Sequence, residues 1–258
     1  MIGELVDMGL WPEALSGFSA VFLIISSMFT SAFTAAFGLG GGVVMLALLV
    51  HFLPIAVVIP IHGVIQMGSN SSRAILLRHF IDWKIILYFL IGAIVGAFIG
   101  GQFVVILPEQ FLLTILGLFI LYVVWGPKPK KIQPNKYIFA IGGAIVTFLT
   151  MFIGATGPLL MSFLPRSKLS PEQISATHGM LMVVQHGLKL IIFGILGFQF
   201  FQWAIFLSIM VAGGFIGSNL GCFILNKLPE KWFKIGMNVI LTLLALRMLY
   251  EAILLWRS

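Results

Sequence analysis

The chain has 258 residues, of which 60% are hydrophobic and 9% are charged, and its formal net charge is +7 at pH 7. Because soluble domains carry about 25% charged residues, this composition excludes an ordinary soluble domain and predicts a polytopic helical membrane protein. The cations stand in short loops between apolar runs, where they set membrane topology. The positive charge therefore does not indicate a nucleic-acid partner. The alternating pattern of membrane β-barrel strands is absent from the sequence.

Apolar runs of about 20 residues, the length that crosses a bilayer, recur along the whole chain. In the first half these runs predict long helices at 16–37, 55–78, 85–106 and 110–126, with a short apolar segment at 43–53. The glycines from Gly38 to Gly42 end the first helix, and Pro54 ends the short segment. A basic, proline-rich linker follows at 127–136.

The second half repeats this order of elements. It predicts long helices at 137–153, 173–197, 204–225 and 231–256, and a very short segment at 159–164 after a break at 154–158. We therefore divide the chain into a first repeat at 1–126, the linker at 127–136 and a second repeat at 137–258.

Short motifs in the two halves are related by one constant offset in residue number. Gly38 and Gly154 differ by 116 positions (154 − 38), and so do Gly41 and Gly157 (157 − 41). The same offset relates His62-Gly63 to His178-Gly179, Thr34 to Thr150 and Met45 to Met161. A His-Gly pair in gapless register with two glycines indicates homologous halves, each with a glycine-broken segment followed by a helix that contains a histidine.

The distribution of loop charges predicts the topology of the two halves. The loop at 78–84 is basic and the loop at 107–110 is not, whereas 198–202 carries no cation and 226–234 carries three lysines. With the basic linker in the cytoplasm, the halves are predicted to be inverted relative to each other, with both termini extracytoplasmic. Inverted repeats with broken helices are typical of secondary transporters, which bind substrate near the membrane midplane between the repeats.

The two glycine breaks are candidate substrate-binding sites. Lipid cannot satisfy the backbone N–H groups that a break exposes, and the start of a helix attracts negative charge. We expect an anion to contact the backbone at the first break and the backbone and hydroxyl at the second: Gly40, Gly41, Gly42, Thr156 and Gly157. The alternative is that the glycines only allow membrane helices to pack closely.

Polar side chains inside the third helix of each half are further candidates. They are His62, Gln66, Asn70 and Arg73 in the first half, and His178, Gln185, His186 and Lys189 in the second. Intramembrane ionisable residues are costly and default to functional hypotheses, so the histidines could bind substrate or couple transport to protons. The alternatives are a neutral histidine that donates to a backbone carbonyl, and an arginine whose guanidinium extends toward the lipid headgroups.

The sequence also favours some chemistries over others. No carboxylate is placed securely inside a predicted span, which favours an anionic or neutral substrate over a cation. His178 and His186 stand about 12 Å apart along a helix, too far to share a metal ion, and Cys222 is the sole cysteine. Catalytic and nucleotide-binding motifs are absent. We therefore expect neither an enzyme nor a bound metal or cofactor.

Several motifs together resemble the TauE/SafE family of membrane permeases. They are Phe37-Gly-Leu-Gly-Gly-Gly42, the polar helix that ends at Arg78, Ile81-Asp82-Trp83 and the stretch from Gly96 to Gly100. The second-half copy extends the resemblance over nearly the whole chain. The resemblance implies an inner-membrane exporter of small sulfur-containing anions such as sulfite or sulfoacetate. The second glycine motif, Gly154-Ala-Thr-Gly-Pro158, departs from the pattern because it has fewer glycines, so the halves need not contribute equally to binding.

The sequence thus predicts an all-α membrane protein of two inverted repeats, each with four long transmembrane helices and one short glycine-broken segment. Its expected partners are the lipid bilayer and a small anion that it moves by alternating access. Alternatives that stay open are a passive anion channel, a permease for another small carboxylate or sulfonate, and a membrane assembly or sensor subunit. Proton coupling and homodimer formation also stay open.

Overall fold

The computed structural model of the protein describes residues 15–37, 40–104, 106–127, 135–164, 169–224 and 230–257. Within these ranges every regular element is helical, as the composition predicts. The first half contains α2 (Gly17–Phe37), α3 (Gly41–Phe52), α4 (Ile55–Leu76), the 3-10 helix η1 (Arg78–Phe80), α5 (Trp83–Val104) and α6 (Glu109–Trp125). The second half contains α7 (Lys136–Ile153), α8 (Gly157–Phe163), α9 (Pro171–Ile195), the 3-10 helix η2 (Phe200–Trp203), α10 (Ala204–Ile224) and α11 (Glu230–Arg257).

Length and composition qualify six helical segments in the described part of the chain as candidate membrane spans. They are Gly17–Ala36, Trp83–Val104, Lys136–Ile153, Pro171–Ile195, Phe200–Gly221 and Ile235–Arg257. The sequence predicts eight long transmembrane helices, and α4 and α6 account for the difference. The 17 residues of α6 are short for a span, and α4 has 22 residues but a polar second half. The polar side chains of α4 other than Ser71 are buried within the protein, so they do not face lipid.

Two glycines allow the backbone conformations that the helix breaks require. Gly40, which precedes α3, has φ 106°, and Gly154, which follows α7, has φ 78°. A side chain is rarely compatible with these left-handed values. Proline supports the boundaries nearby, because Pro54 precedes α4 and Pro158 occupies the first turn of α8. The sequence of each half therefore sets a long helix, a sharp break and a short helix in succession.

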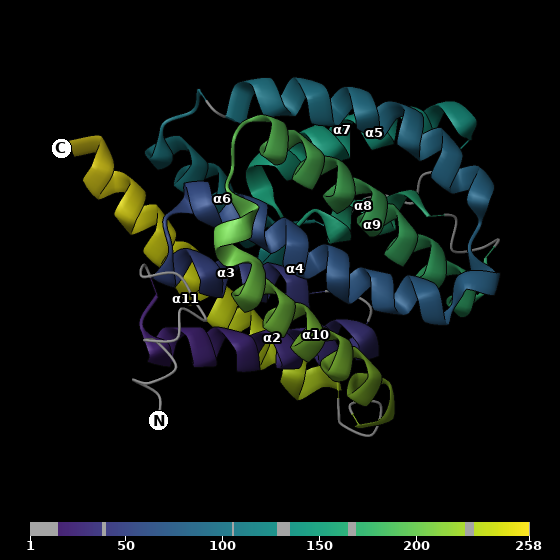
Figure 1. Cartoon of the computed structure of the whole chain (residues 1–258), viewed down its shortest axis with the longest axis horizontal. Helices are drawn as coiled ribbons and strands as arrows, with labels where there is room; N and C mark the ends of the chain where they lie inside the picture. Colours follow the sequence, from purple (N-terminus) through teal and green to yellow (C-terminus); the bar gives the residue numbers. More distant parts are fainter. Residues whose placement is uncertain are drawn as a thin grey trace.

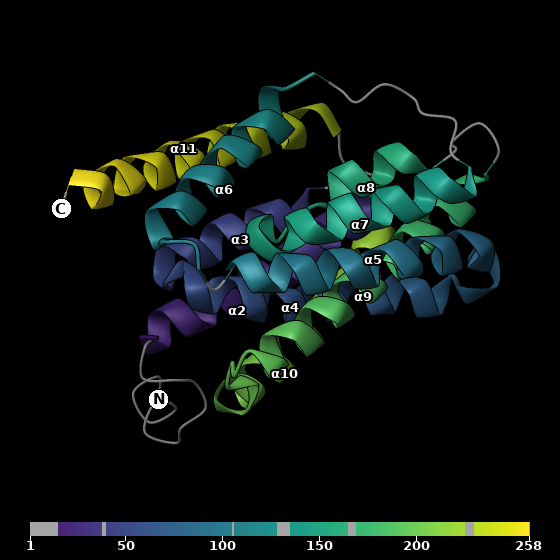
Figure 2. The same cartoon turned by 90° about the horizontal axis from the view of Figure 1, so that it is seen from above.

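The two halves are interlocked. The largest helix contacts join α5 to α7 and α2 to α10, and each of these pairs takes one helix from each half. Figure 1 shows the α5–α7 pair along one side of the molecule and the α2–α10 pair along the other, with α4 and α9 between them. Figure 2 shows α6 beside α11. Exchanging each helix for its counterpart in the other half turns the α5–α7 pair into the α10–α2 pair, as expected of two related halves.

Glycines allow the paired helices to approach to backbone contact. A Cβ atom at Gly96 of α5 would lie 2.9 Å from the carbonyl carbon of Ala144 in α7. A Cβ atom at Gly217 of α10 would lie 2.8 Å from the carbonyl carbon of Met28 in α2. Such close approach through small residues is how membrane helices associate in the absence of a hydrophobic driving force. The α5–α7 and α2–α10 pairs are therefore tightly packed. Helices α4 and α9 lie between them and carry the buried polar side chains.

Candidate functional site

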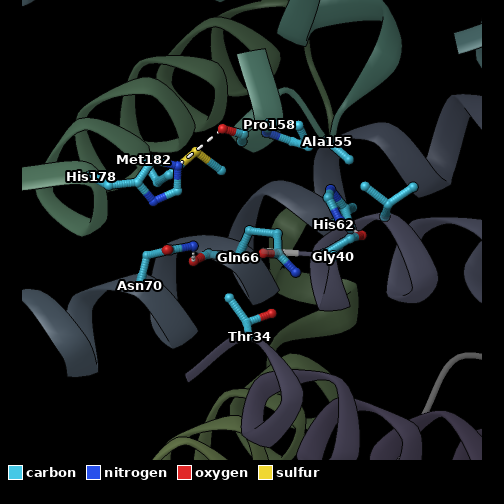
Figure 3. A pocket seen from close by; sticks show the side chains of 12 residues that line it. Thr34, Gly40, His62, Gln66, Asn70, Ala155, Pro158, His178 and Met182 are labelled. Carbon is cyan, nitrogen blue, oxygen red and sulfur yellow. Dashed lines mark hydrogen bonds between the residues drawn. The ribbon is translucent and has the colours of Figure 1, made fainter. Parts of the chain in front are cut away.

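A small cavity with both polar and apolar lining residues lies where the two helix breaks face α4 and α9. Its volume is about 30 Å³, enough for roughly two water molecules. Figure 3 shows that its lining side chains come from both halves. The lining residues are Thr34, Gly40, Gly42, Val43, His62, Gln66, Asn70, Ala155, Gly157, Pro158, His178 and Met182.

Each half ties its histidine to the start of its own short helix. The His62 Nε2 atom is 2.9 Å from the carbonyl oxygen of Gly42, and the His178 Nε2 atom is 3.1 Å from that of Gly157. Since a carbonyl only accepts, both imidazoles donate through Nε2–H. The ring of each histidine therefore bridges a polar helix and a helix break, with 0% and 2% of the two residues exposed. Figure 3 shows His178 and His62 on either side of the cavity.

Arg73 is held by one residue from each half. Its Nη2 atom donates to Asn70 Oδ1 at 2.7 Å and to His178 Nδ1 at 3.2 Å. A guanidinium has no acceptor, so His178 Nδ1 accepts from it while Nε2–H donates to Gly157. Asn70 in turn donates to the carbonyl of Gln66 at 2.8 Å. Arg73 thus brings a permanent positive charge to two of the residues that line the cavity.

Lys189 and His186 lie behind the cavity wall. Both are 0% exposed, and the Lys189 Nζ and both His186 ring nitrogens have no hydrogen-bond partner among the described residues. The His186 ring stands edge-on to that of His62, with 6.0 Å between the centroids. His62 Nδ1 is likewise buried without a partner in the described part of the chain. The three side chains therefore form an enclosed cluster, of which His62 alone also lines the cavity.

Thr156 and Gln185 support the second helix break. The Thr156 hydroxyl is hydrogen-bonded to Thr150 and donates to Gln185 Oε1 at 3.2 Å. Gln185 Nε2 donates to the carbonyl of Val146 in α7 at 2.9 Å. Both side chains are 0% exposed and neither lines the cavity. Their contacts connect the break to α7 and α9.

A second, smaller cavity adjoins the first. Its volume is about 10 Å³, and Thr34 and Asn70 line both cavities. The other residues that line it are Ser31, Ala35, Ser69, Arg73 and Ser218, from α2, α4 and α10. Among the described residues, no aspartate or glutamate lines either cavity. The electrostatic environment of the pair is set by Arg73 and by hydroxyl, amide and imidazole groups.

The structure brings some of the expected site residues together and separates others. Those that line the first cavity are Gly40, Gly42, His62, Gln66, Asn70, Gly157 and His178. Arg73 lines the second, while Gly41, Thr156, Gln185, His186 and Lys189 line neither. Sequence reasoning did not assign Thr34, Val43, Ala155, Pro158 or Met182 to the site. For two of them the sequence contained a clue in the constant offset of 116. At this offset Thr34 matches Thr150, and Met182 matches Gln66, which was itself an expected site residue.

Six candidate membrane spans and a cavity between broken helices are typical of membrane transporters. Comparison with known proteins agrees with this class. A family model described as "Sulfite exporter TauE/SafE" matches residues 23–248. The chain belongs to this family, which confirms the resemblance seen in its motifs.

The amino-acid sequence is also similar to that of a curated protein. The chain is 27% identical over 171 residues to the "Probable inner membrane transporter protein TsaS" of Comamonas testosteroni. The aligned region covers 62% of this chain and 70% of that protein. No solved structure matches the chain.

Proposed function

We propose that this protein is a secondary transporter that exports a small sulfur-containing anion, such as sulfite or sulfoacetate, across the cell's inner membrane. The observation that carries the proposal is the cavity between the two helix breaks. Arg73 is hydrogen-bonded to two of its lining residues, and no carboxylate lines it among the described residues. Transport changes no bond of the anion, so the proposed activity is not enzymatic.

Recognition of the anion draws on backbone and side-chain donors together. The first N–H groups of α3, from Gly41 and Gly42, have no acceptor within the helix, and the helix dipole adds partial positive charge there. Gln66 lies beside this turn, since a Cβ atom at Gly42 would be 2.8 Å from Gln66 Oε1. A charged donor such as Arg73 strengthens the binding of an oxyanion. The first half supplies more of these donors, because Pro158 removes an N–H from the equivalent turn of α8.

The cavity is small and only partly open, and alternating access would open it further to one side of the membrane at a time. Its volume of about 30 Å³ has to increase for an anion larger than water to enter. The smaller cavity between α2, α4 and α10 supports a route from one side of the membrane. In an inverted repeat, the equivalent route from the other side runs between α7, α9 and α5. The two termini are extracytoplasmic in this proposal, and the basic linker is cytoplasmic.

A thermal-shift screen of the detergent-purified protein tests the binding site. The panel holds sulfite, sulfoacetate, taurine, sulfate, lactate and calcium. A ligand at a hundred times its Kd stabilises the folded state by about 2.7 kcal/mol, which corresponds to a rise in Tm of about 5–10 °C for a chain of this length. We expect sulfur oxyanions to raise the Tm and calcium to leave it unchanged. A flat response to every anion would contradict the proposed site.

Two arginine variants make the screen specific. Arg73→Met removes the buried guanidinium, and we expect it to abolish the anion-induced shift. Arg78→Met removes an exposed cation from η1 and serves as the matched control, which should keep the shift. Loss of the shift in both variants would assign the effect to overall charge rather than to the site.

Counterflow in proteoliposomes tests the transport mechanism. Vesicles loaded with unlabelled anion should take up the labelled anion transiently above its equilibrium level, because a carrier exchanges one for the other. Uptake that does not saturate, together with single-channel currents, would assign the protein to passive anion channels instead. Absence of both flux and binding, with a stable protein partner in a pull-down, would identify an assembly or sensor subunit.

A further inference from the structure

Helices α4 and α9 carry the same three-residue arrangement twice. The arginine slot consists of Arg73, of Asn70 one turn earlier in α4, and of His178 from α9. The lysine slot consists of Lys189, of His186 one turn earlier in α9, and of His62 from α4. Adding 116 to 73 and 70 gives 189 and 186, and subtracting 116 from 178 gives 62. Each slot therefore combines a cation and its helix neighbour with the histidine of the opposite half.

The packing of the two cations confirms that the slots are equivalent in space. A Cβ atom at Gly179, the residue after His178, would lie 3.2 Å from Arg73 Nε. A Cβ atom at Gly63, the residue after His62, would lie 3.4 Å from Lys189 Cδ. Each cation thus crosses the glycine that follows the opposite histidine. In each half, the cationic side chain of the other half packs against the glycine of the His-Gly pair.

The two slots differ in their chemistry. In the arginine slot the guanidinium cannot release its proton, and its Nη2 atom donates to Asn70 and His178. In the lysine slot all three side chains can gain or lose a proton. The Lys189 Nζ, both His186 nitrogens and His62 Nδ1 have no hydrogen-bond partner among the described residues. His62 Nε2–H donates to Gly42, so its Nδ1 carries a lone pair that can accept from an ammonium.

Few other charges reach the lysine slot. The groups that face it are His62 from α4 and His186 from α9, and Lys189 interacts electrostatically with both. The described parts of α2, α8 and α10 contain no ionisable acid or base. The acidic and basic side chains of the remaining packed elements are exposed or half-buried near the helix ends: His51, Arg78, His79, Asp82, Lys84, Glu109, Lys136 and Glu172. Arg73 and His178 are engaged with each other in the arginine slot. An ammonium enclosed here lacks a counterion until an anion arrives nearby.

His62 places the lysine slot next to the substrate. His62 lines the cavity, and its ring centroid is 6.0 Å from that of His186. An anion in the cavity would therefore supply the negative charge that a protonated lysine slot lacks. Departure of the anion removes that compensation and favours release of the proton. The geometry links occupancy of the cavity to the protonation of the lysine slot.

We propose that the lysine slot takes up one proton when the anion enters the cavity and releases it when the anion leaves. The proton comes from water on the loading side, adds to the lone pair of Lys189 Nζ and returns to water on the release side. The resulting ammonium donates to the imidazole nitrogens of His62 and His186, and no bond of the anion changes. This inference rests on the proposed transport function and assigns its coupling to the lysine slot alone.

Proteoliposomes that contain an impermeant pH-sensitive dye test the coupling. Labelled sulfoacetate is the probe, because its sulfonate is a strong acid and its carboxyl titrates near pH ~4, so it carries no proton itself at neutral pH. The membrane potential is clamped. For the native protein we expect about one proton for each sulfoacetate. Counterflow at equal pH on both sides reports transport separately from coupling.

Lys189→Met tests the slot, and Lys84→Met, which removes an exposed lysine from α5, is the matched control. We expect the ratio of protons to sulfoacetate to fall at least tenfold in Lys189→Met, whatever its counterflow rate, and to stay at the native value in Lys84→Met. If Lys189→Met does not fold, Lys189→Arg, which carries a charge that cannot be released as in the arginine slot, takes its place with the same expectation.

Other outcomes separate the coupling from the transport function. Native counterflow without proton movement would overturn the coupling and leave the transport proposal standing. A native ratio that is unchanged in Lys189→Met would remove the lysine slot from the mechanism. Absence of native counterflow would refute the transport of sulfoacetate, and the coupling proposal would fail with it.

Discussion

The contact between α5 and α7 gives a sharp prediction, because it joins the two halves through backbone atoms. In Gly96→Ala the new Cβ would collide with the carbonyl oxygen of Ala144 and lie 2.9 Å from its carbonyl carbon. Ordinary van der Waals contacts of a Cβ begin at 3.4 Å. The backbone of α7 cannot rotate away as a flexible side chain could, so the two helices have to separate.

The size of the effect follows from this separation. Relieving the collision moves the helices apart by about 1 Å, which forfeits roughly half of the dispersion energy of the touching atoms. Overpacking of this kind costs about 1–3 kcal/mol, and the better helix propensity of alanine returns up to about 1 kcal/mol. Because the collision is with backbone, the cost lies at the upper end, and the net loss of about 2 kcal/mol lowers the Tm by about 4–8 °C for a chain of this length.

Thermal unfolding in detergent, followed by tryptophan fluorescence, measures the effect. The matched control is Gly187→Ala in α9, where the nearest atom to the new Cβ would be Met67 Sδ at 3.8 Å. We expect the control to unfold at or above the native Tm. If Gly96→Ala unfolded no earlier than Gly187→Ala, the backbone contact between α5 and α7 would be wrong, and the interlocked arrangement of the halves with it.

Three further substitutions test the site and the surface. Gln185→Leu removes two buried hydrogen bonds, one with the Thr156 hydroxyl and one with a carbonyl of α7, and it should cost about 1–3 kcal/mol in thermal unfolding. Gly42→Ala places a Cβ 2.8 Å from Gln66 Oε1 and should weaken the anion-induced thermal shift at least tenfold in apparent affinity, with little change in the unliganded Tm. Glu251→Gln breaks a half-exposed ion pair of 2.9 Å in α11, and such pairs contribute about 0–1 kcal/mol, so its Tm should stay within about 3 °C of the native value.

The helices could be predicted closely from the sequence because glycine, proline and apolar length mark their ends. The prediction at 55–78 differs by two residues from Ile55–Leu76, and 110–126 differs by one from Glu109–Trp125. The short segment predicted at 159–164 begins earlier, at Gly157, because proline fits the first turn of a helix. The inverted orientation of the halves stays a prediction.

The site was less accessible to sequence reasoning than the helices. Whether a polar side chain of α4 or α9 faces the cavity or the opposite helix depends on how the two helices rotate and cross. The residue offset does not encode that rotation, so Gln66 and Lys189 received the same expected role although one lines the cavity and the other crosses Gly63. Thr34 joins the site only because α3 folds back against α2, where a Cβ at Gly41 would collide with the backbone of Thr30.

The interlocked pairing has a consequence for how the protein is made. During synthesis α2 and α5 enter the membrane first, but their main partners, α10 and α7, belong to the half that is translated later. Until α10 emerges, the surface of α2 that later receives Gly217 and Gly221 remains open to lipid or to an insertion chaperone. The nascent first half is therefore an incomplete unit that must wait for more than a hundred further residues. Two separately expressed halves should for the same reason be degraded alone and protected when they are produced together.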